Sequence, residues 1–350
     1  MKARGWIALV CSTLLVGGAA PHRDDRASVI RRAQVWTRVD VAKKNLKEGP
    51  RGQGAFPFHA RVVCSYIDKT MTGHSPKFTC LAGEDDELKV KYGGTNGEVY
   101  GEILATRLLW ALGFGADRMY AVNVICNGCP ATFGGIARPD GTFRFDPASV
   151  ERKFAGRDFA GKDEAGWKWT ELDLVDPRAG GATRDQVDAL KLLAVFMQHT
   201  DSKPQQQRIV CRTGGKNKCG DPFLMINDVG LTFGRANWLN VDPPGSVDLM
   251  AWRQTPVWKG ETGCIGNLPK SFSGTLDNPR ISDGGRAFLA RLLMQLSDRQ
   301  LSDLFEGARV TYRLREPGRA LSGYPAISEW VDAFKAKRQQ IVDRRCRDDD

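Results

Sequence analysis

Two short acidic stretches decide the fold predicted from this sequence: His199-Thr200-Asp201-Ser202-Lys203-Pro204-Gln205-Gln206 and Asn227-Asp228-Val229-Gly230. An apolar segment leads into each of them. Before the first, Thr183 and Gln186 have the spacing of a capping box, which predicts a helix that runs to about His199. Before the second, the apolar run 223–226 predicts a buried strand. One helix and one strand of the core are therefore expected to present Asp201 and Asp228.

The front of the chain is predicted to be rich in strands and the back rich in helices. Alternating or apolar runs predict strands at 61–67, 77–81, 87–92 and 119–125. Thr95 and Glu98 also have capping-box spacing, which predicts a helix that opens there and ends at Gly113. Amphipathic runs predict helices over 283–306 and 326–345. The predicted fold class is α+β.

The first 20 residues, 1–20, are interpreted as a secretory signal peptide. Lys2 and Arg4 precede an apolar run from Trp6 to Val16, and small residues follow at 17–20. This run is too short for an ordinary membrane helix, so we expect no membrane span after cleavage. The protein is therefore predicted to be periplasmic or secreted. The alternative interpretation of residues 1–20 is a buried N-terminal helix. Residues 21–50 are predicted to form an N-terminal extension, either a tether or one covering helix.

Eight of the nine cysteines lie beyond the predicted signal peptide, and an even number in an exported chain favours disulfides. Local sequence predicts two pairs, one across neighbouring strand-like runs and one across a glycine-rich turn: Cys64–Cys80 and Cys211–Cys219. Cys126 and Cys129 have the spacing of a redox or zinc motif. Neither a thioredoxin-like context nor a second ligand pair accompanies them, so structural cysteines are the favoured interpretation.

The composition supports a folded core and raises the question of a nucleic-acid partner. Of the 350 residues 41% are hydrophobic, which excludes a wholly disordered chain. Lys and Arg total 51 against 41 Asp and Glu, a formal net charge of +10. The basic residues are scattered, however, and no helix-turn-helix, zinc-ligand set or aromatic–basic RNA motif accompanies them, so nucleic-acid binding is disfavoured. A Ser-His-Asp hydrolase is disfavoured as well, because Gly-x-Ser-x-Gly does not occur.

The two acidic stretches resemble the catalytic loop of protein kinases, His-x-Asp-x-Lys-x-x-Asn, and the Asp-Phe-Gly segment that follows it after a strand. The loop Gly73-His74-Ser75-Pro76-Lys77-Phe78 resembles the short phosphate loop of the HipA-like kinases, and the helix that ends at Leu112-Gly113 is similar to theirs. The resemblance covers residues 73–130 and 183–234. The chain therefore resembles an exported, divergent member of the HipA-like and lipid-kinase-like group of atypical kinases.

This resemblance implies a two-lobed, protein-kinase-like fold. A small antiparallel β-rich lobe with one helix would span 51–130, and a larger, mostly helical lobe would span 131–350. It also implies phosphoryl transfer from ATP, dependent on Mg²⁺ or Mn²⁺, to a hydroxyl of a protein, lipid or glycan. Related folds also transfer AMP, and the sequence does not separate the two reactions.

Individual site residues follow from the same resemblance. Asp201 would be the catalytic base, and Asp228 the metal ligand. Lys91 is preferred to Lys89 as the nucleotide-binding lysine, and it would pair with Glu102, because Glu98 is assigned to the capping box. The predicted site residues are Asp201, Lys203 and His199 for catalysis; Lys91, Lys89, Glu102, Lys77 and Ser75 for the nucleotide; and Asp228 and Gln206 for the metal.

Two alternatives remain open at the level of sequence. Gln206 stands where the kinase pattern has Asn, one methylene shorter, which favours a catalytically inactive pseudokinase. The second alternative is a secreted binding protein for a partner protein or an anionic polymer, in which Asp201 caps a helix and Asp228 lies in a turn. Three tryptophans after Asp228 are either substrate contacts or core: Trp238, Trp252 and Trp258.

Overall fold

The computed structural model describes six stretches of the chain, residues 24–71, 73–133, 136–159, 166–215, 218–313 and 325–346. The predicted signal peptide at 1–20 lies outside these stretches and stays a prediction. Within them, no helix is both long enough and apolar enough to cross a membrane.

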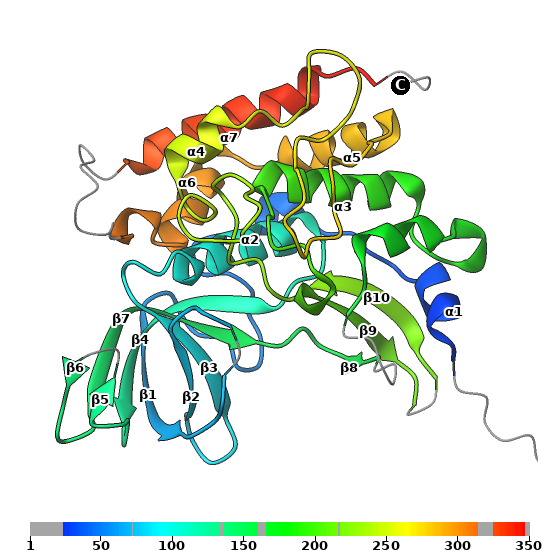
Figure 1. Cartoon of the computed structure of the whole chain (residues 1–350). Coiled ribbons are helices and arrows are strands. Elements are labelled where there is room, and N and C mark those ends of the chain that lie inside the picture. Colours follow the sequence, from blue (N-terminus) through cyan, green and yellow to red (C-terminus); the bar gives the residue numbers. More distant parts are fainter. Residues whose placement is uncertain are drawn as a thin grey trace, which may run out of the picture.

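Five strands close into a small barrel, at the lower left of Figure 1. In order around the barrel they are β1 (Ala60–Ile67), β2 (Lys77–Leu81), β3 (Glu87–Tyr92), β7 (Phe143–Arg152) and β4 (Arg118–Asn127). Successive side chains of a strand point to opposite faces, so alternate residues fill the barrel with an apolar core, including Phe78, Val90 and Tyr120. A small hairpin, β5 (Thr132–Phe133) and β6 (Ile136–Ala137), lies between β4 and β7 in the chain.

The barrel corrects the prediction of an antiparallel front lobe in two respects. β1 pairs with β4 in parallel, because α2 (Glu98–Leu112) carries the chain back across the barrel before β4 begins. The predicted boundary at residue 130 also leaves out β7, which pairs with both β3 and β4. The segment around β7 is rich in Gly and Asp, which hides its strand pattern in the sequence.

α2 lies between the barrel and the helices above it, and nearly all of its side chains are buried (Figure 1). Most of its residues are apolar, as expected for a helix that is covered on nearly every side. It begins at Glu98 after the N-cap Gly97, so the predicted capping box at Thr95 is wrong. Instead the side chain of Asn96 accepts a hydrogen bond from the Glu98 amide, at 3.2 Å. The predicted end is confirmed, because Gly113 takes the left-handed conformation after the last turn.

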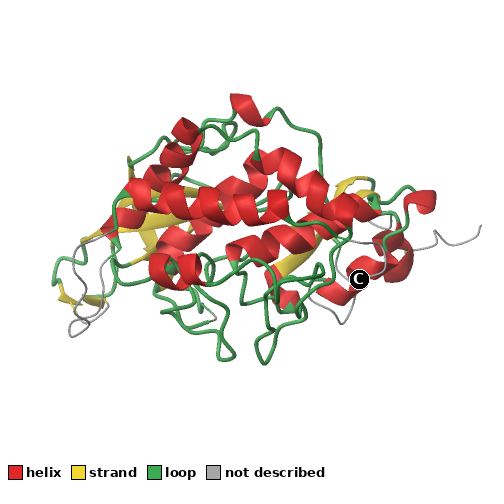
Figure 2. Ribbon diagram, turned by 90° about the horizontal axis from the view of Figure 1, so that it is seen from above, coloured by secondary structure: helices red, strands yellow, loops and turns green. Residues whose placement is uncertain are grey.

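The back of the chain forms a layer of helices over a second sheet, seen from above in Figure 2. The helices are α3 (Arg184–Met197), α4 (Leu249–Gln254), α5 (Asp283–Leu293), α6 (Asp298–Gly307) and α7 (Ile327–Asp343). The sheet has the order β10 (Gly220–Ile226), β9 (Gln207–Thr213) and β8 (Arg157–Asp158). The capping box of Thr183 and Gln186 is confirmed at the start of α3. The predicted single helix over 283–306 is wrong, because a second capping box at Ser297 and Gln300 starts α6.

The N-terminal extension is part of the main core rather than a tether. It contains α1 (Arg26–Arg31) and a 3-10 turn, η1 (Val41–Lys43). Val29, Ile30 and Val41 are fully buried among the helices. The remaining 3-10 turns are η2 (Trp169–Leu174), η3 (Pro177–Ala179), η4 (Pro204–Gln206) and η5 (Val310–Tyr312).

Four pairs of cysteines lie at disulfide distance, and both predicted pairs are confirmed. Cys64 and Cys80 join β1 to β2, and Cys211 and Cys219 join β9 to the chain that leads into β10. The two cysteines of the CxxC motif pair with each other, as structural cysteines would. The fourth pair, Cys264–Cys346, joins the loop after α4 to the end of the described chain.

Candidate active site

Four ionisable side chains from three elements meet between the barrel and the helices: Lys91 of β3, Glu98 and Glu102 of α2, and Asp228 just after β10. The Nζ of Lys91 lies 2.6 Å from Oε2 of Glu98 and 3.9 Å from Oδ2 of Asp228, and it also contacts Oε1 of Glu102. The side chain of Lys91 is only 1% exposed. We call these four residues the Lys91 centre.

The local sequence explains why the lysine and the glutamates face each other. Leu88 and Val90 fill the barrel, so Lys89 and Lys91, on the opposite face of β3, point outwards. Glu98 and Glu102 are four residues apart and therefore share one face of α2. The predicted pair Lys91–Glu102 lies together in the structure, and Glu98 joins it because no capping box engages that side chain.

Two glycines let α2 lie against the turn that carries Asp228. A Cβ on Gly101 would lie 2.3 Å from the carbonyl oxygen of Gly230. A Cβ on Gly230 would lie 2.7 Å from Cγ of Glu98. Any larger residue at either position would push the two elements apart. The glycine of the Asp-Val-Gly turn therefore has a packing role in bringing Asp228 to the glutamates.

Burial and charge set the protonation of the Lys91 centre. Burial by itself would lower the pKa of Lys91, but the carboxylates of Asp228, Glu102 and Glu98 outweigh it and raise that pKa well above its usual range. Burial would raise the pKa of Asp228, yet Lys91 and Lys89 lower it to about 2. Burial raises the pKa of Glu102 to about 8 against the opposing charge of Lys91. At neutral pH the lysine thus stays charged and Asp228 stays ionised, while Glu102 is largely protonated.

The other predicted nucleotide residues lie around this centre but do not join it. Lys89 pairs with Glu151 of β7 at 2.6 Å and makes no hydrogen bond to either glutamate of the Lys91 centre among the described residues. Lys77 pairs across the sheet with Lys91 in the register of β2 and β3, and its Nζ lies 3.5 Å from the hydroxyl of Ser75. Burial and the neighbouring Lys91 lower the pKa of Lys77. Lys77 and Ser75 therefore lie beside the Lys91 centre.

Asp201 forms a second centre with three donors. Its Oδ2 accepts hydrogen bonds from Lys203 at 2.8 Å and from the side-chain amide of Gln206 at 2.7 Å. Its Oδ1 accepts one from the side-chain amide of Asn240 at 3.2 Å. Both carboxylate oxygens are thus oriented by neighbouring side chains. We call these four residues the Asp201 centre.

The hairpin of β9 and β10 holds the two centres together. Its first strand starts at Gln207, directly after η4, and its second ends at Ile226, directly before Asn227 and Asp228. Gln207 and Ile226 are register partners. The backbone carbonyl of Gln206 also accepts the amide of Asn227 at 2.9 Å. Asp201 and Asp228 are therefore fixed at one end of the same hairpin.

His199 makes no hydrogen bond to either carboxylate among the described residues, although both act on its charge. Its ring is in the core beside Trp169, and neither ring nitrogen has a hydrogen-bond partner among the described residues. Burial lowers the pKa of His199 to about 4, so the ring is neutral at physiological pH. This predicted catalytic residue therefore does not hydrogen-bond to the Asp201 carboxylate in the structure.

Of the three tryptophans in the segment 231–262, one is on the surface. Trp238 is 66% exposed and packs against Phe272, which is 64% exposed, while Trp252 and Trp258 are buried. Trp238 lies two residues from Asn240, whose side chain contacts Asp201. An apolar surface therefore borders the Asp201 centre.

Sequence reasoning missed Asn240 and the part that Glu98 plays. Nothing near Asn240 marks it as a partner of Asp201, because the contact spans 39 positions. The contact of Glu98 could have been predicted, since this residue lies one turn from Glu102 and can pair with the same lysine.

The chemistry of the donor set fits a hard cation. Oxygen atoms of Glu98, Glu102 and Asp228 lie within 4.8 Å of one another. Oε2 of Glu102 is buried, and a hydrogen bond from the Glu102 carboxyl helps to lower the pKa of Asp228. Three carboxyl groups around one lysine also leave an excess of acidic groups. Mg²⁺ and Ca²⁺ prefer carboxylate and amide oxygens. Because Lys91 already contacts Glu98 and Glu102, Asp228 is the residue of this set best suited to such an ion.

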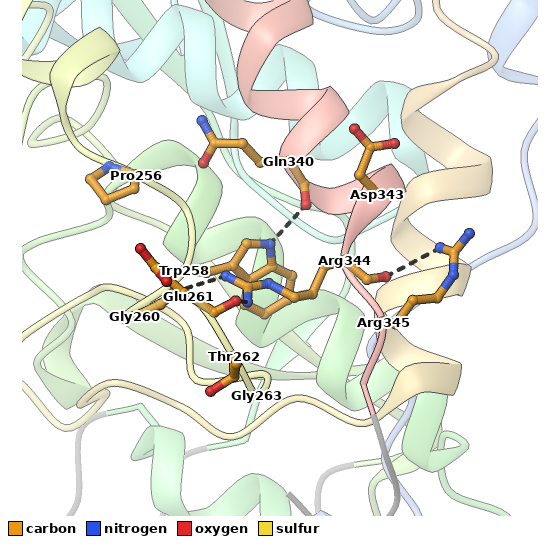
Figure 3. Close-up of a pocket in the computed structure, with 10 residues that line it drawn as sticks. All are labelled: Pro256, Trp258, Gly260, Glu261, Thr262, Gly263, Gln340, Asp343, Arg344 and Arg345. Carbon is orange, nitrogen blue, oxygen red and sulfur yellow. Dashed lines mark hydrogen bonds between the residues drawn. The ribbon is translucent and has the colours of Figure 1, made fainter.

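A separate hollow of about 710 Å³ lies between the loop 256–263 and the end of α7 (Figure 3). Arg344 crosses it, donating to the carbonyl oxygen of Gly260 at 3.0 Å and lying over the ring of Trp258. The Trp258 indole donates to the carbonyl of Gln340 at 2.9 Å. None of the predicted site residues lines this hollow. Its contacts tie α7 to the loop, close to the Cys264–Cys346 pair.

Comparison with known proteins gives similarity in structure alone. No protein-family model matches the chain, and no curated protein matches it. Among solved structures it is similar to the Helicobacter pylori proinflammatory kinase CtkA, with a TM-score of 0.41 and 8% sequence identity, over 81% of this chain and 94% of that chain. A similarity this low carries no inference about activity, which depends on the side-chain geometry described above.

Proposed function

We propose that this chain is a phosphotransferase that moves a phosphoryl group from ATP to a hydroxyl group. The observation that carries the proposal is the pairing of two centres on one hairpin. In the first centre, the fully buried Lys91 lies among three acidic side chains, one of which is Asp228. In the second centre, the carboxylate of Asp201 is oriented by Lys203, Gln206 and Asn240. Phosphoryl transfer needs two such sets of residues: one set binds the phosphates and the metal, and the other orients the attacking hydroxyl.

Asp228 would hold the metal, Mg²⁺ or Mn²⁺, with the amide oxygen of Gln206 as a second ligand. The side-chain amide nitrogen of Gln206 donates to Asp201, which leaves its oxygen for a cation. When bound, the metal would neutralise negative charge on the transferring phosphoryl group. Lys91, held by Glu98 and Glu102, would bind the phosphates of ATP, and Lys77 with Ser75 would cover them.

Asp201 would orient the acceptor hydroxyl and take its proton. Its position at the edge of an exposed apolar surface supports this role, since an acceptor must reach it from solvent. Trp238 and Phe272 border the same edge and would contact the acceptor. Lys203, which is 34% exposed, is free to follow the phosphoryl group as it moves. We further propose that the protein is exported, in keeping with its four cysteine pairs.

The test uses the oxidised chain without residues 1–20, ATP labelled at the γ-phosphate, and Mg²⁺ or Mn²⁺. We expect metal-dependent stabilisation of the protein by ATP and transfer of label to the chain itself or to an added protein. Asp201→Asn should keep the stabilisation and lower labelling by roughly 10²- to 10⁴-fold, the range for a lost general base. Asp228→Asn should lose both signals.

Asp298→Asn is the matched control, because it removes an exposed carboxylate that pairs with Lys335. It should behave like the natural chain. If the natural chain shows neither stabilisation nor labelling, or if Asp201→Asn labels normally, the proposal is wrong. ATP labelled at the α-phosphate separates AMP transfer from phosphoryl transfer.

A catalytically inactive, nucleotide-binding chain is the second candidate. The observation that favours it is that both oxygens of Asp201 already accept hydrogen bonds, one of them from Gln206. Stabilisation by ATP without any labelling across a range of hydroxyl acceptors would support this candidate.

A further inference from the structure

One segment of the chain, residues 237–246, touches both centres. Asn240 donates to Asp201 at 3.2 Å. Two residues later, Oδ2 of Asp242 accepts the backbone amide of Gly97 at 2.8 Å. Gly97 is the N-cap of α2 and directly precedes Glu98 of the Lys91 centre. We call the exposed pair Trp238 and Phe272 the acceptor surface. The segment that carries Trp238 is therefore hydrogen-bonded to the start of α2, the helix that orients Lys91.

Asp242 is itself held by two further side chains. Its Oδ1 accepts a hydrogen bond from Arg313 at 2.6 Å and one from the hydroxyl of Ser246 at 2.7 Å. Arg313 also donates to the Ser246 hydroxyl, at 3.3 Å. Arg313 and Ser246 are buried. A charged pair with this many hydrogen bonds has a defined geometry, unlike an exposed ion pair. We call Asp242, Arg313 and Ser246 the clasp.

The clasp packs against Gly97 so closely that no side chain fits there. A Cβ on Gly97 would lie 1.7 Å from Nη1 of Arg313 and 2.1 Å from Oγ of Ser246. Arg313 follows η5, and the hydroxyl of Tyr100 in α2 donates to the carbonyl oxygen of Tyr312 at 3.0 Å. The first turn of α2 is thus bound at two points by residues of the helical layer.

We propose that Asp242 is a positioning residue: through Arg313 and the Gly97 amide it holds the first turn of α2 where Glu98 and Glu102 reach Lys91. Because Asn240 lies in the same segment, movement at the acceptor surface is transmitted to the Lys91 centre. The consequence for catalysis rests on the proposed function. The consequence for Lys91 does not, because burial of that lysine is measurable without ATP.

The experiment measures how fast an amine-acylating reagent modifies Lys91 in the full oxidised chain, with mass mapping of the peptides. Lys43, which is exposed, provides the internal rate standard. Asp242→Asn keeps an acceptor for Gly97 but removes the charge that Arg313 needs, and Asp242→Ala removes both. We expect Lys91 to be modified about tenfold faster in Asp242→Ala, the size of one lost charged hydrogen bond, with a smaller increase in Asp242→Asn.

The matched control is Asp146→Asn, since Asp146 pairs with the buried Arg309 and so also joins the helical layer to the barrel. It does not touch α2 or the clasp, so Lys91 should stay protected. The proposal is overturned if Lys91 modification is the same in Asp242→Asn and Asp146→Asn, or unchanged in both Asp242 variants.

A kinetic measurement separates this proposal from the proposed function. If the chain transfers phosphate, Asp242→Asn should raise KM for ATP roughly tenfold, and Asp242→Glu should restore part of the loss. If the chain proves inactive while Lys91 becomes reactive in Asp242→Ala, the clasp stands and the phosphotransferase falls. If the chain is active and neither KM nor Lys91 reactivity responds to Asp242, the phosphotransferase stands and the clasp is overturned.

Discussion

The Lys91 centre and the Asp201 centre each contain a lysine beside an acidic side chain, but they differ in how that lysine is held. Lys91 contacts two acidic side chains and lies near a third, and it is 1% exposed. Lys203 contacts one carboxylate and is 34% exposed. A charge withdrawn from water needs full pairing, whereas a half-exposed charge keeps part of its hydration. The first lysine is therefore fixed by the fold, and the second can change its contacts during a reaction.

The most direct way to break this comparison is to make the same substitution in both centres. Lys91→Met leaves acidic side chains buried without their cation, so we expect the free energy of unfolding to fall by about 3–5 kcal/mol. Lys203→Met should lower it by about 1 kcal/mol or less, because exposed ion pairs contribute little. Urea unfolding of the two oxidised variants at one pH measures both values. Equal losses would contradict the distinction between the two centres.

His199 tests the same comparison from the opposite side, because it is buried, like Lys91, but has no hydrogen-bond partner among the described residues. Its effect is visible in the pH dependence of stability. The pKa of His199 is about 4 in the folded chain and about 6.5 when the side chain is free in water. The unfolded chain therefore binds this proton first as the pH falls. His199 therefore leaves the free energy of unfolding unchanged above pH 6.5 and lowers it by on the order of 3 kcal/mol between pH 6.5 and 4.

His199→Phe removes the titrating group and keeps a flat ring beside Trp169. The decline of stability between pH 6.5 and 4 should become shallower by the same amount, as measured by thermal or urea unfolding across that range. His74→Asn is the control, because His74 is exposed. A slope that is unchanged in His199→Phe would show that the ring is solvated in the folded protein.

Local patterns predicted the elements that carry the two centres, and long-range packing decided the rest. The capping box at Thr183 and the C-terminal glycine at Gly113 depend on a few neighbouring residues, and both are confirmed. The capping box at Thr95 had the right spacing, but the side chain of Asn96, one residue closer to the helix, binds the first amide instead. Such competition between neighbouring caps is decided by tertiary contacts, here those of Gly97.

The partners of the site were harder to predict than its acidic residues. Lys91 and Glu102 lie within a strand and a helix, and Asp201 and Asp228 follow a helix and a strand. The periodicity of these four elements is visible in the sequence. Asn240 and Asp242 follow no regular element in the sequence, and they contact residues 39 and 145 positions away. The parallel pairing of β1 with β4 was hidden for the same reason, since it depends on the path of α2.

The spacing of the Lys91 centre can be tested through Gly101. Its Cα lies so close to the turn after Asp228 that a Cβ would meet the carbonyl oxygen of Gly230 at 2.3 Å. Gly101→Ala should therefore lower the free energy of unfolding by about 1–3 kcal/mol, as overpacking does, and weaken stabilisation by ATP. Gly215→Ala is the control, because a Cβ there meets open space. A stabilised Gly101→Ala chain, the outcome expected from helix propensity alone, would contradict this packing.

The smallest effect on the protein is expected from substitution of Asn240, which contributes a single hydrogen bond to the Asp201 centre. Asn240 donates to an oxygen of Asp201 that has no other side-chain donor among the described residues, so Asn240→Ala leaves that oxygen unoriented. We expect the rate of phosphoryl transfer to fall roughly tenfold while stabilisation by ATP is unchanged, because the Lys91 centre is intact. Asn240→Asp should lower the rate further, since it sets a second carboxylate against Asp201. If Asn240→Ala instead weakened ATP binding and left transfer unchanged, the roles of the two centres would be reversed, with Asp201 serving the nucleotide.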